Sequence, residues 1–137
     1  MSDNLFVYGL LKSSFHSHIP ELRVSALLYL GRGVASGRLY DVGRYPGAKF
    51  DSEESAEIFG EIYEVNDQMD VLAKLDDFEG VHEHNPEYRR VLVTITMPET
   101  GQALNCWAYE YCYETEGLQR IESGKYEDDG SLDLTKI

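Results

Sequence analysis

Strand-like segments that follow one another without helices between them are the feature that most constrains the fold of this chain. Residues 88–97, YRRVLVTITM, alternate so that their apolar side chains share one face. The turn PETGQ follows, and residues 103–114, ALNCWAYEYCYE, return as a second long strand, which predicts a β-hairpin. A doubly wound parallel sheet needs helices between its strands. We therefore expect an α+β domain with a small, mostly antiparallel curved sheet or β-barrel flanked by helices.

The rest of the chain adds shorter elements to this hairpin. Further strands are predicted over residues 5–8, 37–42 and 57–65, and Gly60 in the last of them indicates a bulge or a close backbone approach. The sequence YPGA favours a type II turn. Helices are predicted over 18–31 and, from the spacing of its apolar residues, over 66–78.

Length and charge limit the domain organisation and the partners. The 137 residues suit a single domain spanning 1–137, with an acidic tail from about residue 127. The net charge is −13, from 12 basic and 25 acidic residues. Because binding phosphates requires Lys and Arg on one face, we expect neither nucleic acid nor an anionic membrane as a partner. The oligomeric state is not indicated by the sequence.

The two cysteines, Cys106 and Cys112, fall in one predicted strand. Six extended residues separate them by about 20 Å, whereas a disulfide needs Cα atoms within about 7 Å. We therefore expect free thiols, which suits a reducing compartment. The sequence has neither an apolar run of about 20 residues nor a secretory leader pattern, so a cytoplasmic location is expected.

The candidate reactive residue is Glu79, in the segment LDDFEGV. A carboxylate between Phe78 and Gly80, where the helix stops, is expected to be partly desolvated, which raises a carboxyl pKa and suits a general acid and base. The alternative is a solvated acidic helix end, although negative charge is disfavoured there. The adjacent Asp76 and Asp77 are expected to matter much less.

Two histidine pairs raise the question of a metal site. His16 and His18 form one pair, and His82 and His84 form the other. Residues two apart in an extended segment point the same way, but nothing in the sequence brings the pairs together or adds further ligands. Solvated loop histidines are the better interpretation, and no metal is expected.

Gly9, directly after the apolar run that ends at Tyr8, lets the backbone approach a ligand closely. Successive N–H groups of a turn form an anion-binding concavity, which would suit an amino-acid carboxylate. An ordinary turn after a core strand is the alternative.

Seven segments in the same order resemble the γ-glutamylcyclotransferase-like superfamily, in particular its γ-glutamylamine cyclotransferase and AIG2-like branch. The segments are VYGLLK, GRLYDVGRYPG, GEIYEV, LDDFEGV, YRRVLV, WAYEY and IESGKY. They cover nearly the whole chain, and their order carries more weight than any one of them.

The resemblance implies a small β-barrel flanked by helices and a cyclotransferase that releases 5-oxoproline and a free amine, with no cofactor. It implies that Glu79 is the catalytic acid and base. The backbone of Tyr8, Gly9, Leu10 and Leu11 would bind the γ-glutamyl group, and Tyr88 and Tyr45 would line the pocket. Each tyrosine taken alone is more typical of packing.

One departure from the family pattern concerns the substrate. Leu10 and Lys12 stand where similar proteins usually carry Thr or Ser and often Arg. A hydroxyl contact from position 10 is thus absent, while backbone contacts would remain. Two alternatives stay open: a non-catalytic module that binds γ-glutamyl compounds or other small molecules with the same fold, and a metal-dependent protein using His82 and His84. The leaving amine is not indicated.

Overall fold

The structure is a computed structural model that describes residues 4–9, 27–43, 45–65, 68–79 and 81–126. Its elements in chain order are β1 (Asn4–Val7), β2 (Leu27–Asp41), β3 (Pro46–Phe50), β4 (Glu57–Val65), α2 (Gln68–Glu79), β5 (Tyr88–Thr96), β6 (Ala103–Tyr111) and β7 (Gln119–Arg120).

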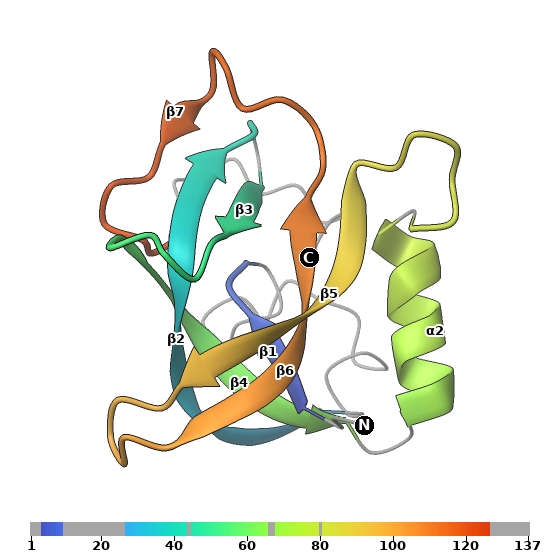
Figure 1. The fold of residues 1–137 in the computed structure, drawn as a ribbon. Coiled ribbons are helices and arrows are strands. Elements are labelled where there is room, and N and C mark those ends of the chain that lie inside the picture. Colours follow the sequence, from blue (N-terminus) through green and yellow to red (C-terminus); the bar gives the residue numbers. More distant parts are fainter. Residues whose placement is uncertain (1–3, 10–26, 44, 66–67, 80, 127–137) are drawn as a thin grey trace.

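Five strands close into a small barrel, with α2 along one side (Figure 1). The strand order is β3-β2-β4-β1-β6-β5, and β5 meets β2 again where Thr96 pairs with Val34. Every pairing is antiparallel except that of β1 with β6. Strands β3 and β7 both extend from β2 outside the ring. The predicted fold class, including the β5–β6 hairpin, is confirmed.

The alternation of side chains along the strands produces two apolar clusters. Phe6, Ile62 and Ile95 belong to the cluster inside the barrel. The opposite face of β1, β4 and β6 packs under α2, where Leu72 and Leu75 are almost fully buried. Burying a leucine contributes about 2 kcal/mol, so this contact fixes one face of α2 against the barrel.

Gly60 is the predicted point of close backbone approach, and the structure confirms it. A Cβ atom placed on Gly60 would lie 2.3 Å from the carbonyl oxygen of Val7 and 2.8 Å from the ring of Phe6. Real side chains do not tolerate such a distance to a backbone atom. Strand β4 therefore presses directly on the end of β1, one residue before Tyr8.

Two local predictions are wrong. Leu27–Gly31, the described part of the helix predicted over 18–31, belong to β2, because this segment pairs with β4 in the register Leu27↔Val65. Residues 18–26 lie outside the described residues. The turn predicted at 45–48 is replaced by strand: Pro46 already begins β3 and pairs with Asp41 of β2.

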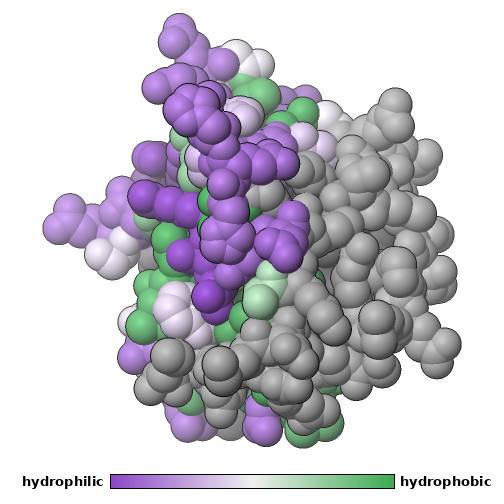
Figure 2. All heavy atoms as spheres, turned by 90° about the vertical axis from the view of Figure 1, so that its right-hand side faces the viewer, coloured by the Kyte–Doolittle hydropathy of each residue, from purple (hydrophilic) through white to green (hydrophobic). Residues whose placement is uncertain are grey.

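The surface of the described residues agrees with the strongly charged composition. The face seen in Figure 2 is mostly hydrophilic where residues are described, with smaller apolar areas between. No helix among the described residues is long and apolar enough to span a membrane. Both described cysteines, Cys106 and Cys112, are free thiols, as predicted.

Candidate active site

The predicted site residues that the structure describes lie at the ends of different elements, and Tyr88 is close enough to Tyr8, Tyr45 and Glu79 for all three to raise the pKa of its hydroxyl, after burial as the main cause. Tyr8 and Gly9 directly follow β1, Glu79 is the last residue of α2, and Tyr88 is the first residue of β5. Tyr45 directly precedes β3. Residues from four distant parts of the sequence therefore lie close together in the fold.

Leu10 and Leu11, the remaining residues of the predicted substrate loop, lie outside the described residues. What the structure does describe of this loop is its start, where Tyr8 and Gly9 are both buried. Lys12 and the histidine pair at 16 and 18 also lie outside the described part.

The Glu79 carboxylate is buried among tyrosines. Glu79 is 1% exposed. Burial raises the pKa values of the Tyr8, Tyr88 and Tyr109 hydroxyls, and the negative charge of Glu79 raises all three further. These tyrosines, one directly after β1 and the others in β5 and β6, therefore stay neutral around the Glu79 carboxylate.

The position of Glu79 in α2 is unfavourable for a negative charge. It is the last helical residue, and the last turn of α2 contains no basic residue. A carboxylate at a helix C-terminus faces the negative end of the helix dipole. The helix end is closed by the Val81 N–H, which donates to the Asp76 carbonyl oxygen at 3.0 Å. The fold thus holds a buried carboxylate where local electrostatics oppose it.

Two of the predicted pocket tyrosines use their hydroxyls to hold β3. The Tyr88 hydroxyl donates to the Pro46 carbonyl oxygen at 2.6 Å, and the Ala48 N–H donates to the Tyr8 hydroxyl at 3.3 Å. The Tyr8 hydroxyl in turn donates to the Tyr109 carbonyl oxygen. The outer edge of β3 is therefore tied to the site by side chains rather than by another strand.

Replacing Tyr88 with phenylalanine tests this edge contact. The change leaves the buried Pro46 carbonyl oxygen without its donor while keeping the ring, so the free energy of unfolding should fall by about 1–3 kcal/mol. Urea unfolding followed by circular dichroism measures the loss. Tyr113→Phe is the matched control, because the Tyr113 hydroxyl donates to the Asn85 carbonyl oxygen at the exposed surface. Equal losses in both variants would contradict a special role for the β3 edge.

Tyr45 joins a wall of tyrosine rings beside Tyr88. The two ring centroids are 6.3 Å apart, and the Tyr45 hydroxyl donates to a Glu87 carboxylate oxygen at 2.6 Å. Tyr111 and Tyr113 continue the wall, with centroid distances of 5.6 Å from Tyr88 to Tyr111 and 5.7 Å from Tyr111 to Tyr113. The high tyrosine content of the sequence is thus partly concentrated in this wall.

Sequence reasoning missed the role of Asp76. This residue is 6% exposed, and its Oδ1 atom accepts from the Tyr109 hydroxyl at 2.8 Å and lies 3.1 Å from Arg90 Nε. Asp77, in contrast, is exposed. The expectation that both aspartates matter much less than Glu79 stays a prediction, but the structure separates a buried, hydrogen-bonded Asp76 from an exposed Asp77. The available signal was its spacing from Leu72 and Glu79, which places all three on one helix face.

The structure gives no support to a histidine metal site in its described part. His82 and His84 are both exposed in the loop after α2. Among the residues that the structure describes, no group of three or more His, Cys, Asp or Glu side chains could hold a metal ion.

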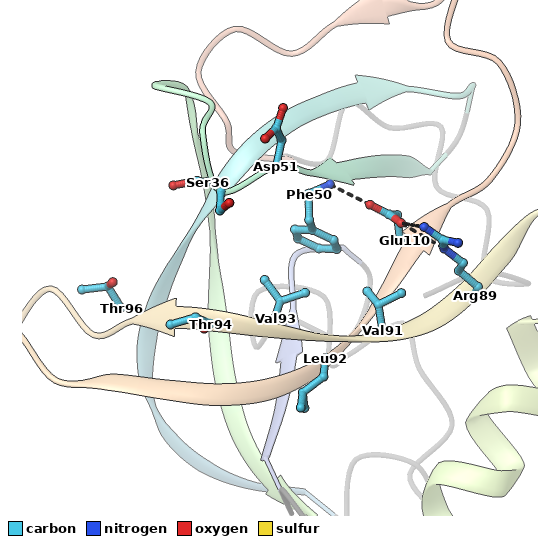
Figure 3. Close-up of a pocket in the computed structure, with 11 residues that line it drawn as sticks. Ser36, Phe50, Asp51, Arg89, Val91, Leu92, Val93, Thr94, Thr96 and Glu110 are labelled. Atoms are coloured by element: carbon cyan, nitrogen blue, oxygen red, sulfur yellow. Dashed lines mark hydrogen bonds and ion pairs between the residues drawn. The ribbon is translucent and has the colours of Figure 1, made fainter.

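A separate groove of about 590 Å³ opens between β5 and the β2–β3 pair (Figure 3). Phe50, Val91 and Val93 point into it, and Leu92 points away. At one end Arg89 and Glu110 form an ion pair at 2.7 Å. None of the lining residues belongs to the predicted site. The two regions adjoin at Phe50, whose ring centroid is 6.0 Å from that of Tyr8.

Comparison with known proteins adds a family to this geometry. A family model described as gamma-glutamyl cyclotransferase, AIG2-like, matches residues 5–128. A protein of Methanocaldococcus jannaschii, provisionally named a gamma-glutamylcyclotransferase, is 34% identical over 124 residues, which cover 90% of this chain and 95% of that protein.

Two solved structures extend the likeness to three dimensions. The crystal structure of an AIG2-like protein from Mus musculus superposes with a TM-score of 0.72 at 28% identity, covering 93% of this chain and 90% of that chain. The solution structure of YtfP from Escherichia coli gives a TM-score of 0.62 at 31% identity. The match covers 91% of this chain and 96% of that chain.

Proposed function

The chain belongs to the gamma-glutamyl cyclotransferase, AIG2-like family, and from that premise we propose that it converts a γ-glutamyl amine or related γ-glutamyl compound to 5-oxoproline and a free amine. The observation that carries the proposal is the placement of Glu79: a carboxylate that is 1% exposed, among three neutral tyrosines, at the end of the barrel where β1 ends. Burial disfavours the charged form of a carboxyl group, which suits proton exchange near neutral pH.

The reaction balances with one proton relay. The α-amine of the γ-glutamyl group attacks its own γ-carbonyl carbon and forms the new C–N bond of the five-membered ring. The α-ammonium group loses two protons on becoming the lactam N–H. Glu79 accepts the first and returns it to the departing nitrogen as the original amide C–N bond breaks. The second is released on ring closure and is taken up by the freed amine, which leaves as an ammonium ion. Because the attack is intramolecular, the protein mainly has to orient the two ends of one substrate and supply this relay.

The loop after β1 and the wall of tyrosine rings at Tyr45 and Tyr88 would orient the substrate. In this proposal the backbone N–H groups from Tyr8 through Leu11 bind the γ-glutamyl group. The Tyr45 hydroxyl donates to Glu87, and the Tyr88 hydroxyl donates to the Pro46 carbonyl oxygen. Because both hydroxyls are already bonded within the protein, the two tyrosines would shape the pocket through their rings. The chemistry calls for neither a metal nor an organic cofactor.

A panel of γ-glutamyl compounds tests the proposal. γ-Glutamyl amino acids, γ-glutamyl alkylamines and γ-glutamyl-ε-lysine are incubated with the protein, and 5-oxoproline release is measured. We expect turnover of at least one class, unchanged after exhaustive chelation. Turnover that is lost on chelation and restored by one divalent ion would contradict the metal-free relay. Binding of a γ-glutamyl compound without 5-oxoproline release would instead identify a binding module.

A further inference from the structure

Two carboxylates occupy the buried face of α2 near its end. Asp76 and Glu79 are three residues apart, which makes them neighbours on one side of a helix, and they are 6% and 1% exposed. Both act on the same group, since Asp76 and Glu79 each raise the pKa of the Tyr109 hydroxyl, after burial as the main cause. Like charges at this spacing destabilise a helix unless a cation or hydrogen bonds compensate one of them.

The compensating groups come from the barrel. Arg90 of β5 places its Nε atom 3.1 Å from Asp76 Oδ1, and its guanidinium group stacks over the Trp107 ring at 4.6 Å. The Tyr109 hydroxyl of β6 donates to the same Asp76 oxygen at 2.8 Å. The Asp76 side chain is therefore the point at which α2, β5 and β6 are joined by polar contacts.

We propose that the Asp76 cluster, formed by Asp76, Arg90 and Tyr109, positions Glu79 and sets the charge that Glu79 faces, which makes Asp76 and Arg90 positioning residues for the proton relay. Asp76 lies three residues, or about one helical turn, before Glu79. The cluster therefore fixes the end of α2 against β5 and β6. It also joins the relay to the substrate loop, because the backbone carbonyl of Tyr109 accepts the hydrogen bond from the Tyr8 hydroxyl. This inference rests on the proposed function of Glu79.

Among the residues that the structure describes, the titratable groups placed near Glu79 include three neutral hydroxyls and one paired carboxylate. Tyr8 directly after β1, Tyr88 of β5 and Tyr109 of β6 face it as neutral groups. Its helix neighbour Asp76 is paired with Arg90.

Two further carboxylates raise the pKa values of tyrosine hydroxyls that Glu79 also affects. Glu110 of β6 acts on Tyr8 and is paired with Arg89 at 2.7 Å. Glu87, just before β5, acts on Tyr88 and accepts the hydrogen bond from Tyr45. Asp76→Asn and Arg90→Gln leave the Glu110–Arg89 ion pair and the Tyr45–Glu87 hydrogen bond in place. Each substitution therefore removes one charge of a single ion pair, that of Asp76 with Arg90.

The two halves of that ion pair have opposite effects on Glu79. In Asp76→Asn the Arg90 cation is left without its anion, which favours the ionised form of Glu79. In Arg90→Gln the Asp76 anion is left without its cation, which favours the protonated form. A purely structural role predicts no such opposition, because loss of packing in either variant would expose Glu79 to water and move both in the same direction.

The experiment measures the titration of Glu79 directly. Protein labelled with ¹³C at the glutamate carboxyl carbon is titrated by NMR, and the Glu79 signal is identified by its loss in Glu79→Gln. The titration midpoint should fall by at least about half a pH unit in Asp76→Asn and rise by at least about half a unit in Arg90→Gln. Arg90→Lys, which keeps the charge, should stay close to wild type. The acid limb of the pH–rate profile for 5-oxoproline release should move in the same directions.

Asp77→Asn is the matched control. It removes the same charge one residue further along α2 from an exposed side chain, so the midpoint should remain within about 0.2 units of wild type because water screens the charge. Midpoints that stay unchanged in Asp76→Asn and Arg90→Gln, or that move together, would overturn the positioning role. If the wild-type protein releases no 5-oxoproline, the proposed function fails, while the titration still decides the role of the Asp76 cluster.

Discussion

Replacing Glu79 with glutamine is expected to lower the rate of 5-oxoproline release by at least about 10²-fold, and by up to about 10⁴-fold. Glutamine has nearly the same shape and can keep a hydrogen bond, but it cannot accept a proton at neutral pH. Substrate affinity should change little, because the loop after β1 is assigned to bind the γ-glutamyl group. The free energy of unfolding should stay the same or rise by up to about 1 kcal/mol, since a negative charge leaves the C-terminus of α2.

Asp77→Asn provides the control for this loss. It makes the same chemical change in the same helix turn, but Asp77 is exposed and distant from the buried face. Its turnover should remain within about twofold of wild type, as expected for a surface substitution. The measurement is the initial rate of 5-oxoproline release on the best substrate of the panel, with a thermal melt for each variant. A Glu79→Gln rate within threefold of wild type would rule out Glu79 as the proton relay.

The parts of the fold that sequence predicts well are those whose signal is local. The alternation along β5 and β6 and the short turn between them define both strands, and the apolar spacing around Leu72 and Leu75 defines α2. The closure of the barrel has no such signal. It depends on one pairing, between Val34 and Thr96, which are too far apart in the sequence for a local pattern to connect them.

The wrong helix prediction around Leu27–Leu30 has a related cause. A run of leucines and a tyrosine suits a helix as well as a strand when it is read alone. Its strand conformation comes from pairing with β4, a segment about 35 residues away in the sequence, including a register shift between Tyr29 and Gly31. Tertiary pairing therefore overrides an ambiguous local pattern here.

The candidate site also contains one residue with a local sequence signal and others that only the tertiary structure reveals. Glu79 stands out in the sequence because an acidic helix end before a glycine is locally unfavourable. The Asp76 cluster does not stand out, because Arg90 and Tyr109 belong to strands whose register against α2 cannot be read from the sequence. Tyr109 is also one of several tyrosines in its segment. Only the packing of α2 on the outer face of the barrel selects it as the partner of Asp76.

The second large effect is expected at Gly60, where a single methyl group should strongly destabilise the fold. The Cβ atom of Gly60→Ala would lie 2.3 Å from the Val7 carbonyl oxygen, so β4 and β1 must separate locally. Overpacking of this kind costs about 3 kcal/mol, which corresponds to a fall of roughly 10 °C in melting temperature for a domain of this size. Because Val7 directly precedes Tyr8, turnover should also fall at temperatures where the variant is still folded.

Gly33→Ala is the matched control, because Gly33 pairs with Gly60 across β2 and β4. A Cβ atom on Gly33 would meet the Ile95 Cγ2 atom at 2.7 Å and the Ile62 Cγ1 atom at 2.9 Å. Both contacts are side-chain atoms that can shift, so the cost should be about 1 kcal/mol. Calorimetric melts of the two variants decide between these expectations. Equal melting temperatures would mean that the backbones of β1 and β4 have room to separate, which would contradict the large effect expected from the close approach at Gly60.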